Sequence, residues 1–196
     1  MSQRPYSQAC ENNKAPILAV LQQHCRASGS LLEIGAGTGQ HAAWLSGQLP
    51  HLDWQPSDVA ANLAGIREWL SEPGSRATPP IELDVGGDWP AGPYDYLLTV
   101  NTFHIMAMPL VRRCIEMGCA SLAPGGKFLV YGPFNYGGDF TSDSNRAFDQ
   151  ALKGTDTQRG IRDQEWVVSL FDQQGMALLA DHAMPANNRL LVFAQR

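Results

Sequence analysis

The chain has 196 residues, of which 44% are hydrophobic and 17% are charged, and its formal net charge is -5 at pH 7. These values are typical of one α/β domain of about 100–200 residues and argue against a disordered chain. The acidic balance gives no global basic surface for nucleic acid, and no uninterrupted apolar run of about 18 residues predicts a membrane span.

The four cysteines, at positions 10, 25, 114 and 119, show no C-x-x-C spacing. The sequence therefore supports neither a zinc site nor a redox motif, and we expect no bound metal. Free thiols and the absence of a signal peptide at the first residues favour a reducing cytoplasm.

The first predicted element is a helix that begins near Asn13. Asn13 is a suitable N-cap, Pro16 suits a first turn, and apolar residues follow at helical spacing. Residues 1–13 are polar, and a disordered tail is the usual expectation for a terminus. The alternative is that residues 1–29 form a segment and helix that cover a ligand site.

The apolar run at residues 31–34 predicts a buried parallel strand that leads into a turn with Gly35, Gly37 and Gly39. The helix that follows is expected to direct its free N–H groups at a ligand. A dinucleotide fingerprint would need its third glycine at Gln40, and no Gly-Lys-Ser/Thr marks a phosphate loop. The spelling G-x-G-x-G, with an acidic residue two positions earlier, resembles motif I of the class I S-adenosylmethionine (SAM) methyltransferases. A purely structural turn is the alternative.

The second predicted strand, residues 53–58, ends at Asp58, about 20 residues beyond the glycine turn. An acidic side chain at this spacing binds ribose hydroxyls in related folds. Asp58 could instead be the N-cap of the helix predicted over residues 59–70.

The third predicted strand, residues 81–85, carries Asp84 near its carboxyl end. Asp84 could accept a hydrogen bond from an exocyclic amine such as that of adenine, or it could be an ordinary turn aspartate. The fourth strand, residues 94–101, leads to His104. This histidine could be a base or a hydrogen-bond donor, or it could be structural.

The remaining elements complete an α/β pattern. We expect a helix over residues 108–122 and a fifth strand over 127–131. The aromatic loop 132–138 is either a lid or an irregular connection. Helices are predicted over 142–152 and 163–171, and strands over 176–184 and 188–194 form a closing hairpin. Such a hairpin is present in class I methyltransferases and absent from the dinucleotide-binding fold.

Nearly the whole chain resembles the family called domain of unknown function 938, which includes the methyltransferase-like 26 proteins. The likeness covers residues 11–18, 33–41, 54–58, 83–85, 101–105, 131–134, 160–163 and 184–188. The resemblance implies a single domain over residues 1–196 with the class I SAM-methyltransferase fold. That fold is an α/β three-layer sandwich around a seven-stranded mixed sheet of order 3-2-1-4-5-7-6. The family is uncharacterised, so the resemblance implies no acceptor.

With this resemblance, the motifs assign residues to three groups. The expected cofactor-binding residues are Asn13, Glu33, Gly35, Ala36, Gly37, Gln40, Asp58, Asp84, Val85, Asn101 and Thr102. His104 and Tyr131 are the candidate catalytic residues. The candidate substrate-binding residues are Arg4, Asn135, Arg162 and Asn187.

The sequence therefore predicts SAM-dependent methyl transfer to a small or medium-sized acceptor, with S-adenosylhomocysteine (SAH) as the second product. Residues 101–104 lack the Asp/Asn-Pro-Pro-aromatic motif of amino-base methylation. One alternative is a module that binds SAM or SAH without turnover, and a less favoured one is an NAD-dependent dehydrogenase. A scaffold with an empty site is the least favoured. We expect no nucleic-acid or membrane partner, and a monomer or homodimer.

Overall fold

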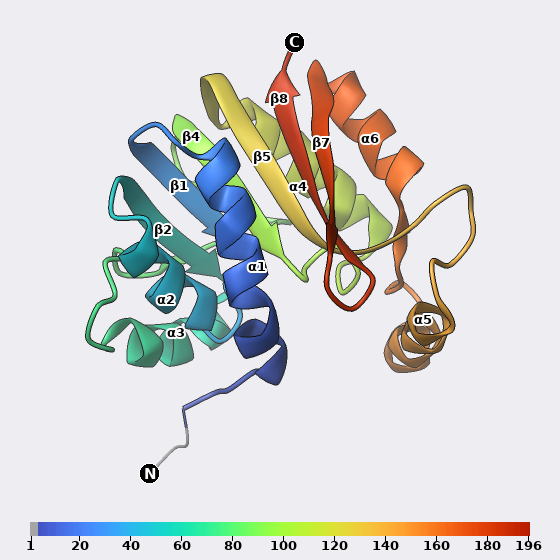
Figure 1. Ribbon diagram of the computed structural model, residues 1–196, viewed down its shortest axis with the longest axis horizontal. Coiled ribbons are helices and arrows are strands. Elements are labelled where there is room, and N and C mark those ends of the chain that lie inside the picture. Colours follow the sequence, from blue (N-terminus) through green and yellow to red (C-terminus); the bar gives the residue numbers. More distant parts are fainter. Residues whose placement is uncertain (1–3) are drawn as a thin grey trace.

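The computed structural model describes residues 4–196, so the first three residues of the predicted N-terminal segment lie outside the described residues. A mixed β-sheet lies between two helical layers (Figure 1). The helices are α1 (Gln8–His24), α2 (Gln40–Gln48), η1 (Ala60–Asn62, a 3-10 helix), α3 (Leu63–Leu70), α4 (Met108–Ala120), α5 (Asp143–Thr155) and α6 (Gln164–Gln173). The strands are β1 (Gly29–Ile34), β2 (Leu52–Asp58), β3 (Ile81–Glu82), β4 (Tyr94–Val100), β5 (Leu122–Asn135), β6 (Arg162–Asp163), β7 (Met176–Met184) and β8 (Asn188–Gln195).

The predicted strand order is confirmed. The sheet runs β3-β2-β1-β4-β5-β8-β7, with β8 antiparallel to both of its neighbours and the other pairs parallel. One correction is needed, because the sheet has eight strands and not seven. The extra strand, β6, is two residues long and pairs only with the end of β5.

The central strands are buried on both faces because their side chains alternate between two apolar cores. Leu31 of β1 faces α1 and α2, and its neighbour Leu32 faces α4 and α6. In β4, Leu98 likewise faces α1 and α2, and Leu97 faces α4 and α6. Helices α1, α2 and α3 cover one face of the sheet in Figure 1, and α4 and α6 cover the other. The edge at the carboxyl ends of the parallel strands is thereby left for a ligand.

The predicted start of the first helix is wrong. Helix α1 begins at Gln8, so Asn13 is a buried interior residue and Pro16 lies inside the helix. Contacts from elsewhere in the chain extend the helix: the Gln40 amide nitrogen donates to Glu11 Oε1 at 2.9 Å and to the Ser7 carbonyl at 3.2 Å. Because Pro16 has no N–H, the helix lacks the bond to the carbonyl of Asn12, four residues earlier.

The loop predicted over residues 132–138 is also corrected. Strand β5 continues to Asn135 and pairs with β8 as far as Pro133. Only a tight turn remains, in which Tyr136 and Asp139 exchange backbone hydrogen bonds of 3.1 and 3.0 Å. Residues 132–135 are therefore a buried part of the sheet and not a lid.

None of the helices within residues 4–196 is both long and apolar enough to cross a membrane. The predicted helix over residues 59–70 is divided into η1 and α3. The predicted third strand is shortened to the two residues of β3.

Replacement of Gly39 by alanine tests the packing of the glycine turn. Gly39 has φ of 90°, and an added Cβ would lie 2.8 Å from the Cα atom of Ile66 in α3. Backbone strain and overpacking should together lower the free energy of unfolding by about 2–4 kcal/mol in urea denaturation. Gly74→Ala is the matched control, because Gly74 has φ of 97° with nothing within 4 Å. Equal losses in the two variants would contradict this account.

Candidate functional site

A cavity of about 440 Å³ opens at the carboxyl ends of β1, β2 and β4. This edge is where open α/β sheets bind ligands. Eight of the predicted cofactor residues line the cavity: Gly35, Ala36, Gly37, Asp58, Asp84, Val85, Asn101 and Thr102. The sequence reasoning missed other lining residues, which are Ser7, Cys10, Ile34, Thr38, His41, Val59, Asn62, Leu83, Val100, Ile105, Met106 and Leu110. The structure thus brings together residues from six separate stretches of the chain.

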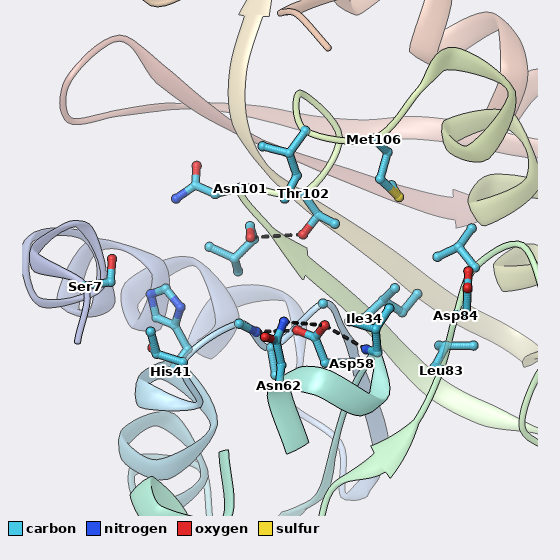
Figure 2. A pocket seen from close by; sticks show the side chains of 18 of the residues that line it. Ser7, Ile34, His41, Asp58, Asn62, Leu83, Asp84, Asn101, Thr102 and Met106 are labelled. Carbon is cyan, nitrogen blue, oxygen red and sulfur yellow. Dashed lines mark hydrogen bonds between the residues drawn. The ribbon is translucent and has the colours of Figure 1, made fainter. Parts of the chain in front are cut away.

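The polar groups of the cavity are spread along its length. In Figure 2, Ser7 and His41 lie toward one end, Asp84 lies toward the other, and Asp58 lies between them. Ile34 of β1 and Thr102 after β4 also line the cavity. The arrangement suits an elongated ligand that meets different polar groups along its length.

Asp58 is the most constrained polar residue of the cavity. Its side chain is buried, and Oδ2 accepts from Gly37 N at 2.6 Å. Oδ1 accepts from Val59 N at 2.8 Å and from Asn62 Nδ2 at 2.9 Å. Because a carboxylate has about four acceptor positions, one remains for a ligand hydroxyl. Asp58 is not the N-cap of η1 or α3; those positions belong to Val59 and Asn62.

The first three backbone N–H groups of the glycine turn donate hydrogen bonds to β2. Gly35 N and Ala36 N each donate to the Ser57 carbonyl at 3.0 Å, and Gly37 N donates to Asp58. These three N–H groups are therefore not free to bind a ligand. The turn is shaped for close packing, since a Cβ on Gly35 would lie 3.0 Å from the Thr102 side chain. A turn with these donors occupied offers little to a phosphate group.

Asp84 is a turn aspartate that also lines the first cavity. Its Oδ1 accepts from Gly86 N at 2.9 Å, as a turn aspartate does. The side chain is nevertheless exposed, and Asp84 lines the end of the cavity formed by the segment after β3.

Three predicted cofactor residues lie behind the cavity wall instead of lining it. Glu33 is buried and accepts from Trp54 Nε1 at 2.8 Å, and burial raises the pKa of its carboxyl to about 7. Gln40 holds Ser7 in place, as described above. Asn13 Oδ1 lies 2.7 Å from His41 Nε2. Burial lowers the pKa of His41 to about 4, so this ring is neutral at pH 7.

A second cavity of about 540 Å³ adjoins the first, since both are lined by Ser7 and Asn101. The two candidate catalytic residues, His104 and Tyr131, line this second cavity. Its other lining residues are Ala9, Asn12, Asn13, Pro133, Ser144, Asn145, Phe148, Pro185, Ala186 and Asn188. The fold therefore places two hollows side by side around Asn101.

His104 and Tyr131 are both buried. The His104 ring packs edge-to-face on Phe148 with 5.3 Å between centroids. Burial, with a smaller effect of the nearby Arg162, lowers the pKa of His104 to about 4. Burial raises the pKa of the Tyr131 hydroxyl, and hydrogen bonds from Asn13 and Asn188 oppose that shift. At neutral pH both side chains are uncharged.

Asn101 has an unusual backbone conformation at the junction of the cavities. Its φ is 57°, which is uncommon for a residue other than glycine, although asparagine tolerates it better than most. The backbone N–H of Asn101 donates to the Tyr131 carbonyl at 2.9 Å and so fixes the turn to β5. Conformations of this kind cluster at functional sites.

The four predicted substrate residues line neither cavity. Arg4 stacks on Trp69 of α3, 3.5 Å from the ring centroid, and pairs with Glu72. Arg162 is buried and donates to the carbonyl groups of Phe103, Met106 and Gln158. Arg162 therefore lies near His104, but it does not line the cavity that contains that ring.

Asn135 and Asn187 line neither of these two cavities, although Asn187 Nδ2 donates to Ser144 Oγ of the second at 3.5 Å. Asn135 is buried in β5, and its Oδ1 has no hydrogen-bond partner among residues 4–196. Asn187 is exposed in the turn between β7 and β8, with φ of 57°.

Within the part of the chain that the structure describes, no three His, Cys, Asp or Glu side chains come together in a way that could hold a metal ion. The four cysteines are free thiols, and Cys25, Cys114 and Cys119 are buried.

Solved structures with the same fold are methyltransferases. An O-methyltransferase family protein from Burkholderia thailandensis has a TM-score of 0.80 and 17% identity, with 95% of this chain and 57% of that chain covered. A putative O-methyltransferase from Nostoc punctiforme has a TM-score of 0.80 and 17% identity, with 95% of this chain and 58% of that chain covered. Human N-acetylserotonin methyltransferase in complex with SAM has a TM-score of 0.79 and 15% identity, with 96% of this chain and 53% of that chain covered.

The chain therefore has the class I SAM-methyltransferase fold, and it spans little more than half the length of these structures. The model of a family described as protein of unknown function, DUF938, matches residues 4–195, and the chain belongs to this family.

The pKa of Glu33 gives a pH-dependent prediction. Its carboxyl titrates near 4.5 in the unfolded chain and at about 7 in the folded one. Between these values the folded state holds the extra proton, so stability falls as the pH rises through this window and the penalty is complete above it. Glu33→Gln should remove this loss and stabilise the protein at pH 8 by about 1–3 kcal/mol, with no gain near pH 4.

Urea denaturation at a series of pH values measures this difference. Glu82→Gln, at an exposed glutamate on β3, controls for the loss of one charge. A difference between Glu33→Gln and the wild type that does not change with pH would contradict the prediction.

Proposed function

We propose that the chain is a SAM-dependent methyltransferase whose first cavity binds the cofactor. The observation that carries this proposal is the Asp58 carboxylate, which lies beside the glycine turn in a cavity at the carboxyl ends of β1, β2 and β4. A carboxylate at this place in an open α/β sheet suits the two hydroxyls of a ribose.

The charges of the first cavity favour SAM over a dinucleotide. Asp58 and Asp84 line it, and no Lys or Arg side chain does so among the described residues. SAM carries a net positive charge, which a cavity with two carboxylates favours over an anionic ligand. A pyrophosphate would meet like charges and a glycine turn whose first three N–H groups are already bonded to β2.

The order of the polar groups along the cavity suggests which part of the cofactor each group would contact. Asp84 and Val85 would meet the adenine, Asp58 the ribose, and the residues near Ser7 and His41 the methionine portion. Asn101 and Thr102 form the inner wall. When bound, SAM supplies an activated methyl group on its sulfonium.

The protein's own residues then have to position an acceptor and exclude water. The N-terminal segment does part of this work, because Ser7 lines both cavities and is held by hydrogen bonds to Gln40. His104 and Tyr131 are our candidates for the acceptor side. The neutral His104 ring can accept a hydrogen bond from an acceptor hydroxyl and so help to orient it.

Asp58→Asn tests the cofactor assignment. The amide keeps an oxygen that can accept from Gly37 N but loses the charge that strengthens a bond to a ribose hydroxyl. Calorimetric titration should show SAM and SAH affinity reduced by about 10- to 100-fold, with the melting temperature checked in parallel. Asp53→Asn is the control, because Asp53 is an exposed residue of the same strand that lines neither cavity.

Several results would change the proposal. Undiminished affinity in a folded Asp58→Asn protein would remove Asp58 from the site. Binding of NAD with no binding of SAM or SAH would favour the dehydrogenase. Tight binding of SAM with no methyl release over a broad set of small acceptors would favour a module that binds the cofactor without turnover.

A further inference from the structure

The side chains that line the second cavity carry no formal charge. Among the described residues that line it there is no Asp, Glu, Lys or Arg, although the adjoining cavity contains Asp58 and Asp84. Its polar groups are asparagine amides, serine hydroxyls, the Tyr131 hydroxyl and the His104 imidazole. A charged ligand there would lose its hydration and gain no counter-charge, which is costly.

The amide and hydroxyl groups are arranged around Tyr131. Asn13 and Asn188 line the cavity together with Tyr131. Asn188 Nδ2 donates to the Pro185 carbonyl at 3.1 Å, within the hairpin turn that closes this side of the cavity. The wall is therefore a network of neutral donors and acceptors from α1, β5 and the β7–β8 turn, which suits a polar ligand without charge.

The opposite wall supplies an apolar surface. Phe148 of α5 is 41% exposed although it packs on the buried His104 ring. A large apolar side chain left open beside a cavity can cover the apolar body of a ligand. The imidazole next to it stays neutral at physiological pH, because burial and the nearby Arg162 lower its pKa to about 4.

We propose that the second cavity receives the methyl acceptor and selects an uncharged polar small molecule, with its apolar body against Phe148 and its hydrogen-bonding groups on His104, Tyr131 and the asparagines. This inference rests on the proposed function, because the acceptor must lie beside the cofactor cavity. Asn101 and Ser7, which line both cavities, mark the place where the two ligands would meet.

The test uses sets of three compounds that share a scaffold and differ only in charge. One such set is para-hydroxybenzyl alcohol, para-hydroxybenzoate and para-hydroxybenzylamine, and further sets carry aliphatic hydroxyls. Each compound is titrated by ligand-observed NMR into the full chain saturated with SAH, so that no turnover occurs. The neutral member should bind at least about tenfold more tightly than either charged member.

A pair of variants in β8 tests whether binding occurs in this cavity. Asn188→Asp adds a carboxylate to the wall, and it should weaken binding of the neutral compound about tenfold and strengthen binding of the cationic one. Gln195→Glu adds the same charge at the exposed far end of the strand, at a residue that does not line the cavity, and it should change neither affinity.

The inference and the proposed function fail in different ways. If the wild type binds neither SAM nor SAH, the proposed function fails and the inference fails with it. If SAH binds, the inference alone is overturned by a preference for a charged member, by equal affinities, or by no binding of any compound. It is also overturned if Asn188→Asp and Gln195→Glu behave alike.

Discussion

The bond between the glycine turn and the end of β2 is the constraint on which the site depends. Three consecutive backbone donors, from Gly35, Ala36 and Gly37, bond to Ser57 and Asp58. These bonds fix the turn against β2, and they hold the Asp58 carboxylate at the centre of the first cavity. They also use donors that would otherwise attract an anion. One set of contacts thus shapes the hollow and determines which charge it favours.

Much of the fold could be predicted because it depends on local patterns. Apolar runs at residues 31–34 and 94–100 indicated central strands, and the glycine spacing indicated the strand-to-helix turn. The hairpin at the carboxyl end of the chain distinguished this sheet from the dinucleotide-binding one. Asp58 could be expected beside the glycine turn because its distance from that turn along the chain is a local quantity that the fold preserves.

The errors arose where long-range contacts decide the outcome. Asn13 has the chemistry of a helix cap, but it is buried inside α1 and bonds to His41 of α2. Arg162 has no obvious core role in the sequence, yet its guanidinium joins the segment after β4 to the residues before β6. The extent of β5 depends on pairing with β8 and β6, which no pattern within residues 132–135 reveals. Cavity residues such as Ser7 and Asn62 carried only weak signals, since both are common surface residue types.

The two cavities come from different parts of the chain. Apart from Ser7 and Cys10, the first is built from residues 34–110, whereas much of the second comes from β5, α5 and the β7–β8 turn. Mutations in the later part can therefore alter the second hollow without disturbing the glycine turn or Asp58. Proteins that share this fold could in this way vary the second hollow while they keep the first one unchanged.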